Sequence, residues 1–242
     1  MRGDVFVKEN IFSEANGAKW REIKTSDFYK PMVEDVKKNA DEFIKNPIAA
    51  LRYSNFKQYY ITGSRKEYER EYFARRGMLN AFSFMALISS DGKYTEALED
   101  IIWAICDEFT WAVPAHIADD LPMNRIRSFI DLFAAETGFA LSEISFLLKN
   151  KLSDKIKRRI EFEVRERIIE SYINNEFWWE RAKLNWAAVC GGSVGAAFMY
   201  MATEDEFLQV KDRLLNTMDC YLSVFENDGA CTEGYSYFLY GF

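Results

Sequence analysis

The spacing of apolar and polar positions predicts an all-α chain. Apolar side chains recur every three or four residues through segments long enough for helices, and Pro (4) and Gly (12) are sparse for a fold built from many turns. Residues 1–29 lack this pattern and predict an irregular arm, which Trp20 and Phe28 pin to the body. The predicted helices span residues 31–44, 64–88, 94–111, 127–137, 141–148, 153–172, 185–201 and 204–225.

Several residues suggest where these helices begin and end. Pro31 suits a first helical turn. Ser64 with Glu67 three residues later fits a capping box, so Ser64 is the expected N-cap of its helix. Gly138 indicates either a break between two helices or a point where another element packs closely.

Two parts of the chain repeat one order of elements. An apolar helix, a short acidic turn and an amphipathic helix follow one another around residues 91–98 and again around residues 204–208. Repetition of a hairpin with one buried and one half-exposed helix predicts a ring or solenoid. We therefore expect an incomplete (α/α) toroid of stacked helical hairpins over residues 61–242, with residues 1–60 forming an N-terminal arm and first helix packed on it.

The charge of the chain limits its partners. The formal net charge of −7 argues against nucleic-acid binding, which needs a basic footprint. An anionic ligand would need a local basic cluster, and residues 155–159 instead resemble a solvated outer face. The better basic surface, although diluted by neighbouring glutamates, comprises Arg65, Lys66, Arg70, Arg75 and Arg76.

No targeting or membrane segment is evident. The N-terminus has no apolar stretch typical of a signal peptide, which predicts a cytoplasmic protein, or a periplasmic or secreted one if a leader has been removed. The helix expected at 185–201 is uncharged but too short and too rich in Gly and Ala for a membrane span. The sequence therefore predicts no membrane partner and is compatible with a homodimer.

The cysteines do not suggest a metal or redox site. Cys106, Cys190, Cys220 and Cys231 form no Cys-x-x-Cys pair and lie in or beside apolar helical patterns, where a free cysteine is often simply buried. Residues 191–195 are rich in glycine but lack the Lys-Ser/Thr ending of a P-loop. We expect no metal and no cofactor.

Four motifs in order resemble one enzyme family. Residues 109–116 contain Trp111-Ala-Val-Pro-Ala-His116, and residues 131–137 form the apolar segment that follows. Asn185-Trp186 precedes Val-Cys-Gly-Gly, and residues 228–240 contain Asp-Gly, Glu-Gly and Tyr-Phe-Leu-Tyr. The set is similar to the helical domain of the heparinase II/III-like polysaccharide lyases, including oligoalginate-lyase-like members, over about residues 60 to 242.

The resemblance implies a fold and a reaction. Members of that family are incomplete (α/α) toroids followed by an antiparallel β-sandwich, which this chain is expected to lack, with the active site between the two. They cleave uronic-acid polysaccharides by β-elimination without a cofactor. A donor stabilises the charge that develops on the uronate carboxylate, a base removes the C5 proton, and an acid protonates the departing glycosidic oxygen.

The resemblance also assigns candidate catalytic residues. Asn185 corresponds to the donor for the carboxylate, and Tyr240, with Tyr237 as second choice, corresponds to the catalytic tyrosine. A tyrosine with its ordinary pKa near ~10 suits the acid role. The family has His after the Asn where this chain has Trp186, so either His116, the only histidine, reaches the cleft, or tyrosine is both base and acid, or activity is lost. Candidate substrate-binding residues are Trp111, Glu136, Trp186 and Glu233.

Structural interpretations compete with these roles. Asn185 could be an ordinary helix N-cap, and Tyr237 with Tyr240 could be core aromatics on one helix face. The preferred partner is an anionic polysaccharide or oligosaccharide. A glycoside hydrolase on a similar ring is the first alternative, and a non-catalytic or truncated carbohydrate-binding helical module is the second. Hydrolysis needs two carboxylates beside the bond, for which the available residues are Asp119, Asp120, Asp131 and Glu136.

Overall fold

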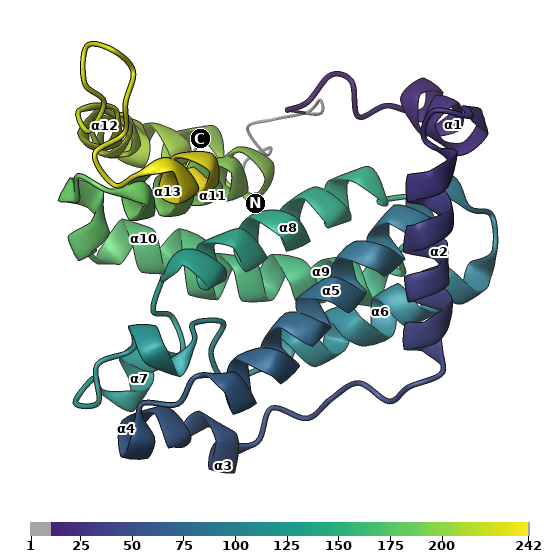
Figure 1. Cartoon of the computed structure of the whole chain (residues 1–242), viewed down its shortest axis with the longest axis horizontal. Helices are drawn as coiled ribbons and strands as arrows, with labels where there is room; N and C mark the ends of the chain where they lie inside the picture. The colour runs from purple at the N-terminus through teal and green to yellow at the C-terminus, as the bar shows by residue number, and fades with distance from the viewer. Residues whose placement is uncertain (1–10, 242) are drawn as a thin grey trace.

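The computed structural model describes residues 11–241, and the chain over that range is all-α (Figure 1). The first helices are α1 (Gly17–Thr25), α2 (Lys30–Ile44), α3 (Tyr53–Phe56), α4 (Gln58–Thr62), α5 (Lys66–Ile88) and α6 (Gly92–Cys106). The short η1 (Pro114–His116), α7 (Met123–Ile126), α8 (Leu132–Leu147), α9 (Asp154–Val164), η2 (Arg165–Ile169) and α10 (Glu170–Asn174) follow. The last elements are η3 (Trp178–Arg181), α11 (Asn185–Met201), α12 (Glu204–Leu222) and α13 (Tyr235–Gly241).

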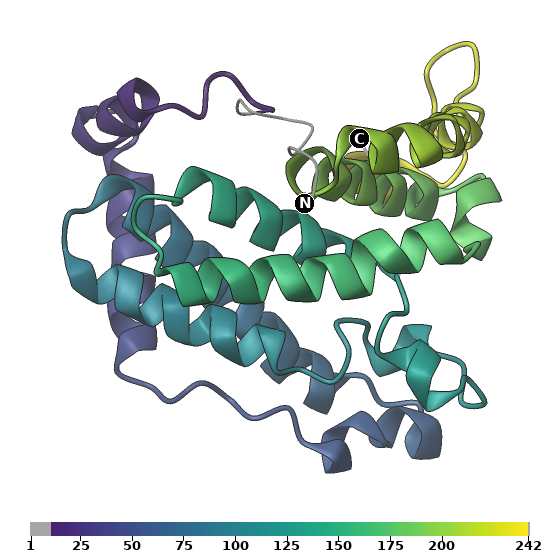
Figure 2. The same cartoon turned by 180° about the vertical axis from the view of Figure 1, so that it is seen from behind.

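Three helical hairpins form the body. α5 with α6, α8 with α9, and α11 with α12 are each consecutive along the chain and packed together, as Figures 1 and 2 show from opposite sides. α8 also packs along α11, which joins the first helices of the second and third hairpins. α6 packs along α9, which joins the second helices of the first and second hairpins. One large hydrophobic core runs through all three hairpins. The predicted all-α class is confirmed.

The N-terminal arm is more regular than predicted. The prediction of an irregular segment up to residue 29 is wrong for α1, which Asn16 caps by accepting hydrogen bonds from the backbone N–H groups of Ala18 and Lys19. Trp20 packs against the main core as expected, whereas Phe28 is 83% exposed, so the prediction that it pins the arm to the body is wrong. Residues 1–10 of the predicted arm lie outside the described residues.

The second and third predicted helices differ from the structure at one end. α5 begins at Lys66, and Ser64 does not cap it: the Ser64 hydroxyl instead donates to the Glu67 carboxylate at 2.6 Å. α6 ends at Cys106 rather than at Trp111. Beyond that end the chain turns inward, and the Trp111 indole N–H donates to the Ile105 carbonyl at 2.9 Å inside the core.

Gly138 lies inside a continuous helix. α8 replaces the two helices predicted at 127–137 and 141–148, so the interpretation of Gly138 as a break is wrong and its close-packing interpretation is confirmed. A Cβ atom on Gly138 would lie 2.5 Å from Cγ1 of Ile168, closer than real contacts allow. The glycine therefore lets α8 approach η2.

Replacing Gly138 with alanine is expected to destabilise the protein by about 1–3 kcal/mol, because the new methyl group overpacks the contact with Ile168. Gly77→Ala is the matched control, since Gly77 lies in α5 and its Cβ would meet nothing within 4 Å. That variant should gain about 0.5–1 kcal/mol from helix propensity. Urea unfolding measures both, and equal effects of the two variants would contradict the close-packing argument.

The long helix predicted at 153–172 is present but contains a π turn. α9, η2 and α10 follow without interruption, and η2 widens the helix over five residues. Arg167 within that turn is buried, donating from Nη2 to the carbonyls of Cys106 and Glu108. Its guanidinium also lies 4.6 Å from the centre of the Trp111 ring. η2 thereby contributes the charged group that satisfies the C-terminal end of α6.

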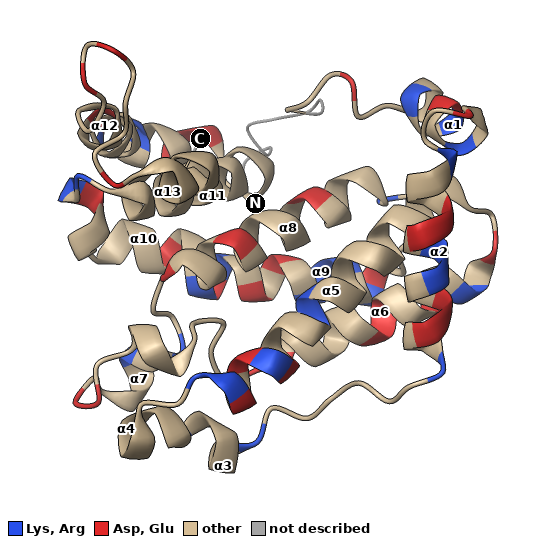
Figure 3. Ribbon diagram, viewed as in Figure 1, with Lys and Arg blue, Asp and Glu red and all other residues tan. Residues whose placement is uncertain are grey.

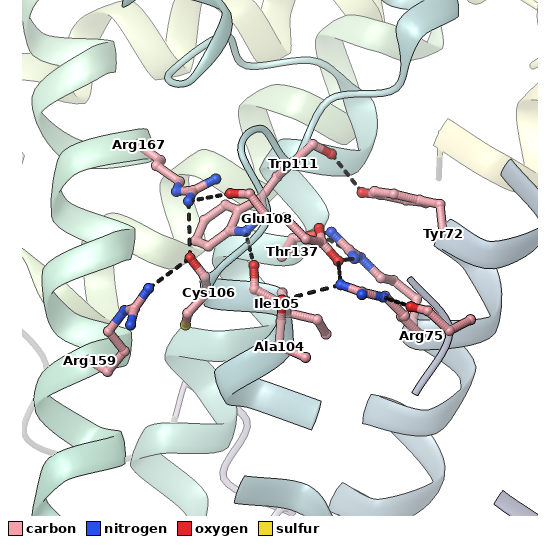
Figure 4. A network of polar contacts seen from close by, with 12 residues as sticks. Tyr72, Arg75, Ala104, Ile105, Cys106, Glu108, Trp111, Thr137, Arg159 and Arg167 are labelled. Carbon is pink, nitrogen blue, oxygen red and sulfur yellow. Dashed lines mark hydrogen bonds and ion pairs between the residues drawn. The ribbon is translucent and has the colours of Figure 1, made fainter. Parts of the chain in front are cut away.

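A buried polar network joins α5, α6 and α8 (Figure 4). Glu108 Oε1 accepts from Nη1 of Arg75 at 3.1 Å and from Nη1 of Arg76 at 2.6 Å, while Arg76 also donates to Thr137. Arg75 and Arg76 are therefore part of the interior, and the prediction that they belong to a basic surface is wrong.

Arg65 and Arg70, at the N-terminal end of α5, are paired with acids. Figure 3 shows acidic and basic positions interspersed at the N-terminal part of α5. Arg65 Nε lies 2.6 Å from Glu69, and Arg70 Nη2 lies 2.6 Å from Glu71. No helix within residues 11–241 combines the length and apolarity that crossing a bilayer requires.

Asp41 ties α2 to the start of α6. Its carboxylate accepts hydrogen bonds from Lys93 Nζ at 2.9 Å and from the Tyr94 hydroxyl at 2.8 Å, and Lys37 on α2 lies at 3.0 Å. These hydrogen bonds, first that from Lys93, hold the pKa of Asp41 far below its ordinary value.

Asp41→Asn should therefore lower the free energy of unfolding at neutral pH. A carboxyl whose pKa is depressed on folding stabilises the protein above its unfolded pKa, and that contribution is lost as the pH falls towards the folded value. The difference in the free energy of unfolding between the wild type and the variant should decrease below about pH 4. Asp35→Asn, at an exposed position of α2, is the control. A difference that does not change with pH would contradict the assignment.

Candidate functional site

Elements far apart in the sequence meet at one face of the helical body. η1 lies before α8, the first turns of α8 and α11 approach it, and α13 packs on α11 (Figure 1). Seven of the eight candidate residues lie in these elements or immediately before them: His116, Glu136, Asn185, Trp186, Glu233, Tyr237 and Tyr240.

His116 is held by a buried carboxylate. Its Nδ1 lies 2.7 Å from Oδ2 of Asp131, a residue with no exposed surface. Asp131 is also the N-cap of α8, accepting from Ala134 N–H at 2.7 Å, and it accepts from Val113 N–H at 3.2 Å. A carboxylate in this position accepts a hydrogen bond from Nδ1–H, which leaves Nε2 of a neutral imidazole as a lone-pair acceptor. Asp131 thus fixes the orientation of the His116 imidazole.

Aromatic rings fix the plane of His116. The imidazole stacks on Phe133 with ring centres 5.4 Å apart and meets Trp186 edge-on at 4.8 Å. Trp178, whose side chain is 57% exposed, lies 4.8 Å from Trp186. Nε2 of His116 is 3.5 Å from Nη2 of Arg65. His116 therefore lies against Trp186. Trp186 is the residue that stands where the heparinase II/III-like lyases have a histidine.

Asn185 holds a carboxylate. It is buried, and its side-chain Nδ2 donates to Oε1 of Glu233 at 2.9 Å while its backbone N–H donates to Oε2 at 2.5 Å. Asn185 is the first residue of α11 and Leu184 is the cap position, so the N-cap interpretation of Asn185 is wrong. The N-terminus of a helix also favours a negative charge. The start of α11 is thus a cradle for a carboxylate group, which Glu233 occupies.

Glu136 and Tyr240 form a second polar pair. The Tyr240 hydroxyl lies 3.2 Å from Oε1 of Glu136. Burial raises the pKa of Glu136, and burial with the neighbouring Glu136 charge raises the pKa of Tyr240 well above its ordinary value. The phenol is therefore protonated at neutral pH, as a proton donor must be, and the phenolate is disfavoured. Tyr240 is 41% exposed and Tyr237 54%, so the core-aromatic interpretation is wrong for both.

Trp111 does not belong to this face. It is 1% exposed, its indole N–H is bonded to the Ile105 carbonyl, and the Arg167 guanidinium lies over its ring. A side chain sealed in this way cannot stack on a sugar, so the substrate-binding prediction for Trp111 is wrong. The motif around residues 109–116 positions His116 instead.

The carboxylates available for hydrolysis are not presented as a matched pair. Asp131 is completely buried and accepts three hydrogen bonds, whereas Asp119 and Asp120 are exposed in the loop after η1. Glu136 is the remaining partly accessible group of the four. Within the described part of the chain, no cluster of three or more His, Cys, Asp or Glu side chains is arranged to hold a metal ion.

Phe133, which stacks on His116, was not predicted as a contributor to the site. Arg65 was predicted only as part of a basic surface, and Trp178 only as one of several tryptophans that could stack on a sugar. Asp131 was noted only as part of a motif and as a carboxylate for hydrolysis. Its position directly before an apolar helical run is an N-cap signal, but nothing in the sequence connects it with His116. Comparison with known proteins finds no family model that matches the chain and no characterised protein with significant sequence similarity to it.

Proposed function

We propose that this chain is the helical domain of a polysaccharide lyase that cleaves uronic-acid glycans by β-elimination. The observation that supports the proposal most strongly is the carboxylate cradle at the start of α11. Its two donors, Asn185 Nδ2 and Asn185 N–H, already bind the carboxylate of Glu233. A uronate presents the same chemical group, and the hydrogen-bond geometry that suits one carboxylate suits the other.

In this proposal the reaction divides among three side chains. Asn185 donates to the substrate carboxylate and stabilises the negative charge that develops on it. Nε2 of His116 exchanges its contact with Nη2 of Arg65 for the substrate and accepts the C5 proton, and Asp131 stabilises the imidazolium that forms. Tyr240 donates its phenolic proton to the glycosidic oxygen as the C4–O bond breaks. The raised pKa of Tyr240 favours this division over one in which tyrosine is the base.

Glu233 must give way in this mechanism. Its carboxylate occupies both donors of Asn185, so a substrate carboxylate has to exchange with it. Glu233 lies directly before Gly234, whose φ of 93° is in the left-handed region that glycine adopts readily. We propose that the segment before α13 moves when the substrate binds.

The arrangement of hairpins supports a wider proposal about the fold. We propose that α5/α6, α8/α9 and α11/α12 are consecutive units of an incomplete (α/α) toroid. The contacts of α8 with α11 and of α6 with α9 fit such a ring, in which first helices neighbour first helices and second neighbour second.

The test uses the full chain with alginate, heparan sulfate and hyaluronan. Lyase activity produces an unsaturated uronate, detected by its ultraviolet absorbance, and Tyr240→Phe should lower that rate by about 10²–10⁴. Tyr235→Phe, at an exposed residue of α13, should leave it unchanged. A rate insensitive to Tyr240→Phe would overturn the role of Tyr240, and no unsaturated product from any of these glycans would overturn the function.

One observation favours a non-catalytic carbohydrate-binding module as the second candidate. The cradle of Asn185 is filled by Glu233, while Trp178 is exposed beside Trp186 as a surface on which a sugar ring could stack. Glycan binding without turnover, lost in Trp178→Ala but unchanged in Tyr240→Phe, would support this module over the lyase.

A further inference from the structure

A cavity lies away from the candidate lyase site. It measures about 690 Å³ and lies among α3, α5, α6 and α7, a size typical of small-molecule sites. None of the residues assigned to the lyase reaction lines it, so either proposal can fail without the other. Its walls are mainly aromatic and aliphatic, and include Leu51, Tyr53, Phe56, Tyr68, Phe109 and Met123.

Four charged residues line this cavity. Arg52 and Asp107 are exposed and opposite in sign, whereas Arg75 and Glu108 belong to the buried network that Figure 4 shows. Oε1 of Glu108 accepts from both Arg75 and Arg76, whereas Oε2 is buried and has no hydrogen-bond partner among the described residues. A buried polar atom without a partner is costly, so a cavity-lining residue with an orphan oxygen indicates a group that could complete it.

We propose that this cavity binds a neutral small molecule with a ring body and one O–H or N–H group that donates to Oε2 of Glu108. The walls bury the ring, and the O–H or N–H group of the ligand gives Oε2 of Glu108 the hydrogen bond that it lacks. The terminal torsion of a glutamate is broad, so a rotation that turns Oε2 towards the cavity is accessible. The same rotation shifts Oε1, whose hydrogen bonds from Arg75 and Arg76 adjust with it.

The charges beside Oε2 select a neutral ligand. Arg75 and Arg76 both lie within hydrogen-bond distance of Glu108, so the two guanidinium groups disfavour an ammonium ligand. A carboxylate ligand would bring its own negative charge to an oxygen that can only accept. A neutral hydroxyl or amide N–H meets neither objection.

Isothermal titration calorimetry with four matched compounds tests the proposal. 2-Naphthol has the ring and a donor, and 2-methoxynaphthalene keeps the ring and oxygen but lacks the donor. 2-Naphthoate and 2-naphthylmethylammonium carry a negative and a positive charge. We expect 2-naphthol to bind at one site and each of the others at least about tenfold more weakly, because hydrogen bonds to charged groups contribute that much.

A pair of variants shows where the compound binds. Phe109 lines the cavity and is 48% exposed, whereas Phe162 is 55% exposed on α9 and does not line it. Phe109→Ala should weaken 2-naphthol binding severalfold, and Phe162→Ala should not change it. The proposal is overturned if 2-naphthol does not bind, if 2-methoxynaphthalene or a charged compound binds as tightly, or if the two variants behave alike.

Discussion

Replacing Glu163 with alanine should lower the free energy of unfolding by about 3–5 kcal/mol. Glu163 is only 2% exposed, and its two oxygens contact Arg167 Nε at 2.7 Å, Arg127 Nη2 at 2.8 Å and Arg159 Nε at 3.2 Å. Arg167 is itself buried, so removing Glu163 leaves a guanidinium without its counter-charge in the interior. That loss is a large share of the stability of a typical domain, and guanidinium chloride unfolding measures it.

Two further variants separate the buried pair from a general effect of removing a charge. Glu166→Ala deletes the same side chain at an exposed position of η2 and should change stability by no more than about 0.5 kcal/mol. Replacing Glu163 and Arg167 together with methionine should recover part of the loss, because no buried charge then lacks a partner. A loss in Glu163→Ala no greater than that in Glu166→Ala would mean that the buried pair contributes little.

Sequence periodicity predicted elements where local pattern and tertiary packing agree. α11 begins and ends where the apolar run does, and α2 begins one residue before Pro31. Prediction failed where a long-range contact decides. Gly138 weakens a helix locally, but α8 continues through it because Ile168 packs where a side chain would lie. The early end of α6 depends on Arg167, which lies about sixty residues further along the chain.

The candidate site also has a part that the sequence predicted and a part that depends on long-range contacts. Motif order named Asn185, His116 and Tyr240, but the pairs that define their chemistry join residues 48, 15 and 104 positions apart, namely Asn185 with Glu233, His116 with Asp131, and Tyr240 with Glu136. A single sequence carries no information on which distant residues form such pairs. The prediction for Trp111 failed for a related reason: an aromatic residue near a helix end can equally stack on a sugar or pack in the core.

His116→Gln should lower the rate of the proposed elimination by about 10²–10⁴, because it removes the group that takes the C5 proton. Glutamine keeps a polar group of similar reach near Asp131, so the fold should survive, with an unfolding temperature within a few degrees of the wild type. The rate is measured as unsaturated uronate formed under saturating glycan, and the unfolding temperature by calorimetry. This prediction depends on the proposed function.

Chemical rescue distinguishes a catalytic base from a structural histidine. His116→Ala opens a space between Phe133 and Trp186, where the imidazole ring now lies 5.4 Å and 4.8 Å from theirs. Added imidazole can enter that space, donate to Asp131 and accept the proton in place of the missing side chain. We expect added imidazole to restore activity to His116→Ala in proportion to the concentration of neutral imidazole. Activity lost beyond rescue in a variant that remains folded and still binds glycan would assign His116 to positioning, whereas undiminished turnover would remove it from the reaction.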